Sequence, residues 1–158
     1  MTRVVATGTF DILHPGHLWY LHESAKLGDE LFVIIARDVN IRHKPRPVIP
    51  EEQRRVMVEA LKPVTHAILG DLEDMFRPIR EIKPDIITLG CNQLFDPETI
   101  RASLEKQGII TEIVRISQYS DSPFTSSRGI VREIVQRSHP QDRPGENENP
   151  DRREEKGY

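Results

Sequence analysis

The chain has 158 residues, enough for one domain with a buried core, and its 37 % apolar and 30 % charged residues are ordinary for a globular protein. The formal net charge is −3, so there is no excess of basic residues to indicate a nucleic-acid partner. The single cysteine, Cys91, cannot form a disulfide within the chain, and no apolar run approaches the roughly 18 residues that would span a bilayer. We therefore expect a cytoplasmic protein that binds neither nucleic acid nor membrane.

Short β-rich runs alternate with segments of helical spacing over the first 137 residues. Strands are predicted at 3–7, 30–36, 64–69, 85–89 and 110–116. The run at 31–35 is continuously apolar, which is typical of a strand covered on both faces of a sheet. This alternation predicts an α/β fold with a doubly wound parallel sheet, in a single domain that spans residues 1–137.

The helices between these strands have recognisable ends. The first is predicted to begin near Gly16, with Gly28 as its C-terminal stop. Further helices are predicted to open at Pro50 and to cover 73–83 and 97–107. The last begins at residues 125–127, Thr-Ser-Ser, whose hydroxyls suit a helix N-cap, and it is expected to bury Ile130 and Ile134.

The composition changes at Ser138. Prolines recur at positions 140, 144 and 150, and polar or charged residues fill the intervals. Such a segment buries too little apolar surface to offset the entropy lost on ordering it. We predict that residues 138–158 form a disordered polar tail.

The segment richest in chemistry is residues 8–17, GTFDILHPGH, between the first strand and the first helix. In α/β folds this is where phosphates bind, because the free amides of a helix start attract negative charge. His14 and His17 lie three residues apart, so both imidazoles can point into one crevice and donate to phosphate oxygens. Strand, turn, helix, two glycines and two histidines together indicate a phosphate-handling site rather than a structural histidine.

This segment resembles the HxGH signature of the cytidylyltransferase-like nucleotidyltransferase superfamily. The resemblance implies a Rossmann-like, five-stranded sheet in the order 3-2-1-4-5. Three further segments, ARD at 36–38, IPEEQRR at 49–55 and EALKPV at 59–64, are similar to the archaeal FAD synthase family. That family implies FMN adenylyltransferase activity, in which AMP passes from ATP to FMN and pyrophosphate leaves. It also implies a homodimer, and a divalent cation, Mg²⁺, held chiefly through the substrate phosphates.

Two alternatives remain open at this stage. One is a cytidylyltransferase acting on glycerol 3-phosphate or a similar phosphate ester, which shares the first signature. Its characteristic RTxGIST segment is missing, and residues 119–127 here read YSDSPFTSS. The other is a non-catalytic nucleotide-binding module on the same fold, against which the presence of both histidines, Lys44 and the hydroxyl cap argues.

The candidate site residues fall into three groups, drawn from the chemistry of the residues and from the resemblance. The expected catalytic residues are His14, His17 and Lys44. The expected nucleotide contacts are Thr9, Phe10, His14, Pro15, Gly16, His17, Asn92, Tyr119, Thr125, Ser126 and Ser127. The expected acceptor contacts are Asp11, Asp38 and Arg46. For the two aspartates the alternative roles are to orient the metal or to cap a turn. Trp19 and Tyr20 are interpreted as packing residues.

Overall fold

The computed structural model describes residues 1–42, 45–119 and 121–139. Within them five parallel strands form one sheet in the order β3-β2-β1-β4-β5, so the predicted fold class and strand order are confirmed. The strands are β1 (Arg3–Gly8), β2 (Glu30–Ile35), β3 (His66–Leu69), β4 (Ile86–Leu89) and β5 (Glu112–Arg115). The predicted tail lies outside the described residues from position 140 onward.

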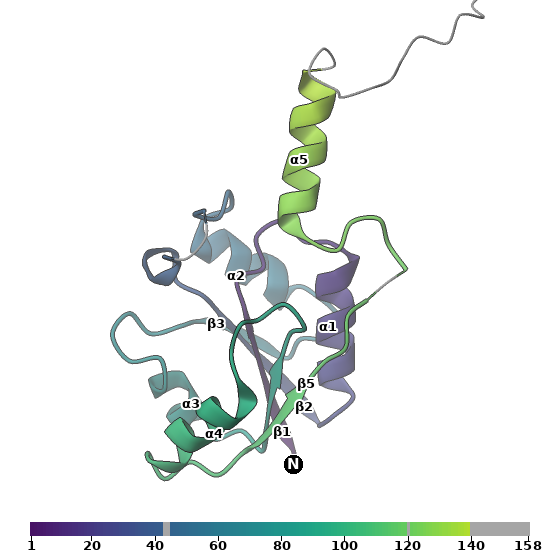
Figure 1. Ribbon diagram of the computed structural model, residues 1–158. Helices are drawn as coiled ribbons and strands as arrows, with labels where there is room; N and C mark the ends of the chain where they lie inside the picture. The colour runs from purple at the N-terminus through teal and green to yellow at the C-terminus, as the bar shows by residue number, and fades with distance from the viewer. Residues whose placement is uncertain (43–44, 120, 140–158) are drawn as a thin grey trace, which may run out of the picture.

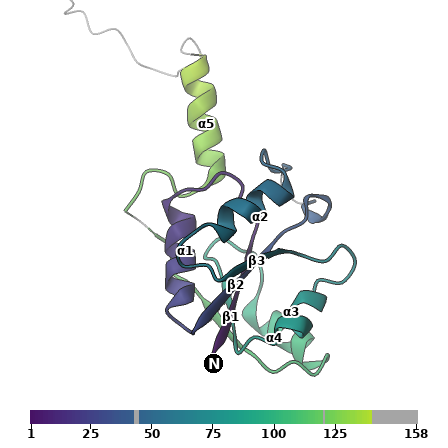
Figure 2. The same cartoon turned by 180° about the vertical axis from the view of Figure 1, so that it is seen from behind.

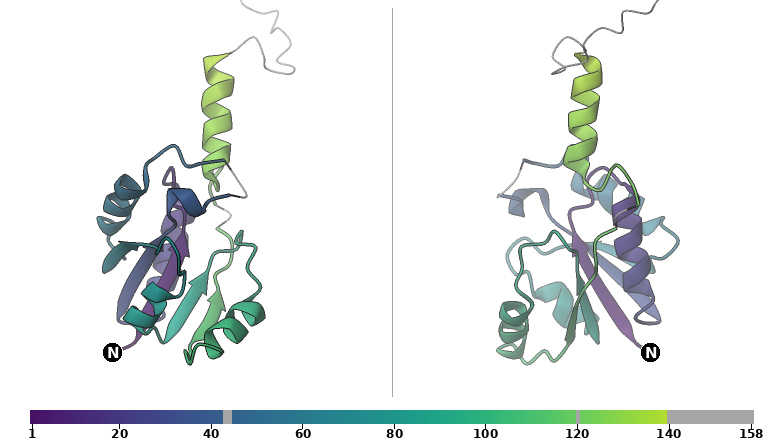
Figure 3. Two further views of the ribbon diagram at one scale, coloured as in Figure 1. Left: turned by 90° about the vertical axis from the view of Figure 1, so that its left-hand side faces the viewer. Right: turned by 45° about the vertical axis from the view of Figure 1, so that its right-hand side comes forward.

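Helices cover both faces of the sheet. They are α1 (Pro15–Ala25), α2 (Glu51–Glu59), α3 (Arg77–Ile82), α4 (Pro97–Glu105) and α5 (Ser127–Ser138), with a short 3-10 helix, η1 (Asp38–Asn40). The views in Figures 1, 2 and 3 place α1 and α2 on one face, and α3 and α4 on the other. None of the helices in the described ranges is long and apolar enough to cross a membrane.

The central strand β1 divides the core into two layers. Val4 and Ala6 point to one side and pack with Leu21 of α1 and Val58 of α2. Val5 points to the other side and packs with residues of α3 and α4, among them Leu104. Successive strand residues face opposite sides of a sheet, so one short apolar strand contributes to both layers.

The fifth helix departs from the sequence expectation. Residues Ile130 and Ile134 were expected to be buried, but no residue of α5 is buried and Ile134 is 55 % exposed. Figures 1 and 3 show α5 projecting beyond the carboxyl edge of the sheet rather than packing on it. The apolar spacing of the segment is genuinely helical, but spacing alone does not say which surface a helix packs against.

The role of Gly28 also differs from the expectation. Helix α1 ends at Ala25, its C-cap is Lys26 in right-handed geometry, and Gly28 does not adopt a positive φ. Instead, a Cβ built on Gly28 would lie 2.7 Å from the carbonyl oxygen of Thr2 and 2.7 Å from a methyl carbon of Val4. The glycine is therefore required by the close approach of the chain leading into β1, not by a left-handed helix stop.

We expect the substitution Gly28→Ala to lower the free energy of unfolding by about 1–3 kcal/mol, because the new methyl must displace backbone rather than a mobile side chain. For a domain of this size that corresponds to a melting temperature lower by about 2–4 °C per kcal/mol. Gly90→Ala is the matched control, because the nearest atoms to its new Cβ lie 3.9 Å away. Equal melting temperatures for the two variants would contradict this assignment.

Candidate functional site

The candidate site lies at the carboxyl edge of the sheet, where β1 runs into the start of α1. His14 is the N-cap of α1, with φ −144° and ψ 168°, and its Nδ1 accepts a hydrogen bond from the Gly16 amide at 3.1 Å. The side chain is buried, and this burial lowers the pKa of His14 below its ordinary value of 6.5. The imidazole is therefore neutral near pH 7 and satisfies one of the free amides at the helix start.

The two histidines of the signature lie together. The rings of His14 and His17 are stacked, with centroids 3.8 Å apart and planes 24° apart. The buried ring of Phe10 also lies beside His17, at 5.3 Å between centroids and with the planes tilted by 54°. Phe10 adopts a left-handed φ of 52°, and a Cβ on Gly8 would come 2.7 Å from its ring. The turn thus brings the two imidazoles together and backs one of them with an aromatic ring.

The start of α5 meets the same loop. Ser126 caps α5, since its Oγ accepts a hydrogen bond from the Gly129 amide at 3.1 Å. The Ser127 hydroxyl donates to the carbonyl oxygen of Ile12 at 3.0 Å, and this bond ties α5 to the loop between β1 and α1. Thr125 lies against Gly16, where an added Cβ would be 3.5 Å from the Thr125 carbonyl oxygen. Two helix N-termini, of α1 and α5, therefore lie close together, which favours a polyanionic ligand.

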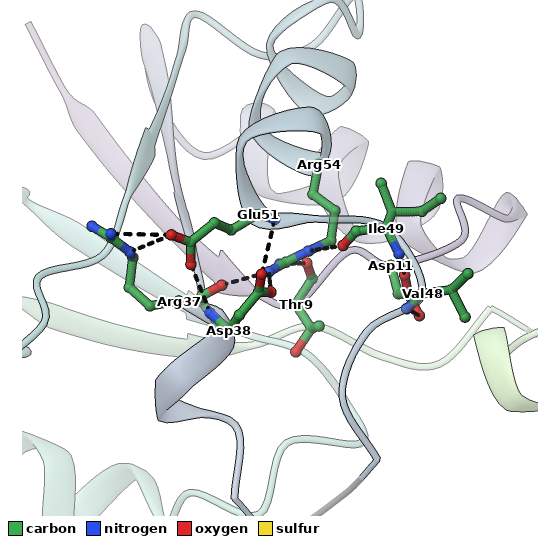
Figure 4. A network of polar contacts seen from close by, with 9 residues as sticks. Thr9, Asp11, Arg37, Asp38, Val48, Ile49, Glu51 and Arg54 are labelled. Carbon is green, nitrogen blue, oxygen red and sulfur yellow. Dashed lines mark hydrogen bonds and ion pairs between the residues drawn. The ribbon is translucent and has the colours of Figure 1, made fainter.

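The two aspartates at this edge hold the backbone. Asp11 accepts hydrogen bonds from the amides of Val48 and Ile49, at 2.9 and 2.8 Å. Asp38 accepts from the Arg54 guanidinium at 2.6 Å and from the Glu51 amide at 3.3 Å (Figure 4). These contacts fit the turn-capping alternative, and contact with an acceptor stays a prediction for both residues.

Arg54 joins three segments at this edge, and the sequence analysis missed it. Its side chain is fully buried, and the guanidinium donates to the carbonyl oxygens of Thr9, Ala36 and Ile49 at 2.5, 2.9 and 2.9 Å (Figure 4). It therefore fixes the exits of β1 and β2 and the entry to α2. A signal existed in the sequence: Arg54 lies four residues before the buried Val58, on the apolar face of α2.

A second carboxylate extends this network to the outer strand. Glu51, the first residue of α2, accepts from the Nε of Arg37 at 3.0 Å and from the amide of Asp38 at 2.7 Å. Arg37 also donates to the carbonyl oxygen of Gly70, beyond β3. The sequence analysis did not identify Glu51 as a site residue, although its place in the first turn of a helix beside the β2 exit makes it a natural partner for a free amide.

The other predicted residues surround this centre. Asn92 is exposed in the loop after β4, and Arg46 is exposed in the loop before α2. Tyr119 lies against Trp19 of α1, with ring centroids 5.6 Å apart, and both border a hollow of about 370 Å³ on the outer side of α1. Lys44, the third predicted catalytic residue, lies outside the described residues.

Comparison with known proteins identifies the family. Residues 5–133 match the cytidylyltransferase-like family. The chain is 81 % identical over 139 residues to the FAD synthase of Methanospirillum hungatei, covering 88 % of this chain and 89 % of that protein. It is 59 % identical over 151 residues to the FAD synthase of Methanosphaerula palustris, covering 96 % and 99 % of the two chains.

Two solved structures are similar to this chain. A Thermoplasma volcanium protein, described as a lipopolysaccharide core biosynthesis protein, is 50 % identical, with a TM-score of 0.74 over 76 % of this chain and 99 % of that one. A protein of unknown function from Archaeoglobus fulgidus shares the fold, with a TM-score of 0.62 at 20 % identity over 78 % of this chain and 95 % of that one. The chain therefore belongs to the cytidylyltransferase-like family and, within it, to the group of archaeal FAD synthases.

Proposed function

We propose that this protein is an FAD synthase, an FMN adenylyltransferase that transfers AMP from ATP to FMN and releases pyrophosphate. The observation that carries the proposal is the stacked pair His14 and His17 at the start of α1, beside the N-terminus of α5. The naming of close relatives as FAD synthases supports the choice of ATP and FMN as substrates. An oxygen of the FMN phosphate attacks the α-phosphorus of ATP, and the bond from that phosphorus to the β-phosphate oxygen breaks.

The hydrogen bond at His14 decides which of its nitrogens carries the proton. Nδ1 accepts from the Gly16 amide, so in the neutral imidazole the proton resides on Nε2. Nε2–H is then a fixed donor that a phosphate oxygen can meet without any change in protonation. His17 stacks on this ring, and we propose that it donates to the same α-phosphate. Both donors act most strongly where charge grows in the transition state.

No general base is required for this reaction. A phosphate monoester is already ionised near neutral pH, so the nucleophile is ready, and the barrier comes from bringing anions together. The start of α5, with Thr125, Ser126 and Ser127, is placed to hold the departing pyrophosphate by its free amides and hydroxyls. Catalysis is then mainly a matter of positioning and charge stabilisation.

The remaining predicted residues take supporting roles in this proposal. Lys44 neutralises the pyrophosphate, and Asn92 and Tyr119 contact the nucleotide together with Thr9, Phe10, Pro15 and Gly16. Arg46, Asp11 and Asp38 lie near the acceptor. The aspartates act mainly by holding the backbone around it, since both already accept bonds from the chain itself.

A divalent cation fits this arrangement as a companion of the substrate. Among the described residues, no group of three His, Cys, Asp or Glu side chains is arranged to hold a metal ion. When bound through the phosphates, Mg²⁺ would supply charge neutralisation along the triphosphate. The helix N-termini and histidines provide the protein's own share of that neutralisation.

The cytoplasmic location and the homodimer remain predictions. Exposed apolar side chains on one stretch of α5, Val131, Ile134 and Val135, offer a surface that a second copy would cover.

The substrate pair is the first test. We expect pyrophosphate release from ATP only when FMN is added, measured with a coupled phosphate assay on the purified protein. FAD should appear in equal amount by chromatography. Much faster turnover of CTP with glycerol 3-phosphate would reject the FAD synthase proposal, and no turnover with any pair would favour a non-catalytic module.

Replacing either histidine by alanine should lower kcat by roughly 10²–10³, the scale of one lost transition-state donor. Nucleotide affinity should fall much less, because the helix amides still contact the ground state. His14→Asn should retain more activity than His14→Ala, since its amide both caps α1 and keeps a donor. His22→Ala, an exposed histidine on the same helix, is the control. Unstable alanine variants with normal kcat per folded molecule would show a structural role only.

The lowered pKa of His14 predicts a pH dependence of stability. The fold favours the neutral imidazole of His14. The contribution of this side chain to the free energy of unfolding is therefore present above pH 6.5, and it is lost as the pH falls through the lower pKa of the folded state. Protonation of Nδ1 would also break the cap at Gly16. The melting temperature of the wild type should therefore fall more between about pH 7 and pH 5 than that of His14→Asn. Parallel curves for the two proteins would contradict the assigned protonation state.

A further inference from the structure

Strands β1 and β4 separate before either of them ends. β1 remains paired with β2 through Gly8, and β4 remains paired with β5 through Leu89. Their mutual pairing stops at Ala6 and Thr88. This is the point where the strand order reverses, with α1 on one face of the sheet and α3 and α4 on the other.

The hydroxyl of Tyr20, from α1, lies between the separating strands. It accepts a hydrogen bond from the Thr7 amide at 3.2 Å and donates to the Thr88 carbonyl oxygen at 2.8 Å. In the register of these strands that amide and that carbonyl form the last link of the ladder, which closes the pair Ala6 and Thr88. The hydroxyl thus bonds both groups of the last link. Burial raises the pKa of Tyr20 to about 12, so the proton that it donates is retained near neutral pH.

The amide of Gln93 spans the next step of the ladder, where β1 and β4 are no longer paired. Its Nε2 donates to the Thr7 carbonyl oxygen at 2.7 Å, and its Oε1 accepts from the Gly90 amide at 3.0 Å. In a continuing ladder the Gly90 amide would donate to the Thr7 carbonyl itself. One side chain therefore bonds the last link between β1 and β4, and another takes the place of the link that would follow it.

We propose that Tyr20 and Gln93 are positioning residues that fix the point where the pairing of β1 and β4 ends, so that the nucleotide can enter between their carboxyl ends. In doubly wound sheets ligands bind at this switch point, and the width of the gap decides what fits. The Tyr20 ring is also stacked on Phe10, at 6.2 Å between centroids. Neither side chain touches substrate in this role; each acts through backbone groups of both strands.

The inference rests on the proposed function, because ATP is the nucleotide that it names. Tyr20→Phe removes only the hydroxyl and keeps the ring. We expect kcat/KM for ATP to fall about 10- to 100-fold, the scale of a reacting group misplaced by roughly 1 Å. Most of the loss should appear in KM for ATP, with KM for FMN little changed. Gln93→Met, which is similar in size but has no amide, should give the same pattern.

The matched control is Ser24→Ala, one turn further along α1. Its fully buried hydroxyl bonds the Tyr20 carbonyl and the Thr88 hydroxyl. It bonds neither the Thr7 amide nor the Thr88 carbonyl, the two backbone groups that the Tyr20 hydroxyl contacts. It should lower the melting temperature while leaving KM for ATP unchanged. If Tyr20→Phe behaves in the same way, the hydroxyl is merely structural and the proposal is overturned.

Amide hydrogen exchange, followed by NMR, tests the contacts independently of activity. The Thr7 amide should exchange slowly in the wild type and in Ser24→Ala, and much faster in Tyr20→Phe. Equal exchange rates in all three proteins would refute the proposed hydroxyl contact. A wild type that fails to turn over ATP with FMN would refute the proposed function, while this exchange comparison would still decide whether Tyr20 fixes the end of the pairing between β1 and β4.

Discussion

The site depends on how the backbone is satisfied where parallel strands end. Inside the sheet each amide and carbonyl has a ladder partner, but beyond the carboxyl edge there is no further strand residue to pair with. A buried polar group without a partner lowers the free energy of unfolding, that is, it makes the fold less stable. Here side chains replace the missing partners: Arg54 for three carbonyls, Asp11 for two amides, and Gln93 between β1 and β4. These residues thus hold the shape of the candidate site, and in our proposal the histidines and the helix N-termini bind the ligand.

The side chains that pair with backbone groups at this edge also neutralise charge at the candidate site. Carbonyl oxygens at a strand end would repel a triphosphate if they pointed into the site unpaired. The guanidinium of Arg54 binds two of them, those of Thr9 and Ala36, together with the carbonyl of Ile49, and its own charge is matched by Asp38. The carboxylates are likewise occupied by amides and guanidinium groups. Among the described residues, we propose that the donor Nε2–H of His14 and the amides at the starts of α1 and α5 bind an anion.

The sequence predicted those features that are encoded locally. The strands, the helix start at the GTFDILHPGH segment and the serine cap of α5 follow from apolar periodicity and cap residues, whereas the strand order was implied by the family resemblance. The missed features depend on segments far apart in the chain. Gly28 is needed because Thr2 approaches it, Arg54 is buried because three separate segments present carbonyls to it, and Tyr20 bonds two strands rather than simply packing. The exposure of α5 was missed because helical spacing does not reveal whether a packing surface exists.

The central claim is that the phosphates of ATP lie between the His14–His17 pair and the start of α5. A crystal structure of the protein with FMN and a non-hydrolysable ATP analogue tests it directly. The account predicts the α-phosphate within hydrogen-bond distance of His14 Nε2 and of His17, with the β- and γ-phosphates at the amides of Ser127 and its neighbours. An analogue bound with its triphosphate elsewhere, for example in the hollow bordered by Trp19 and Tyr119, would contradict it.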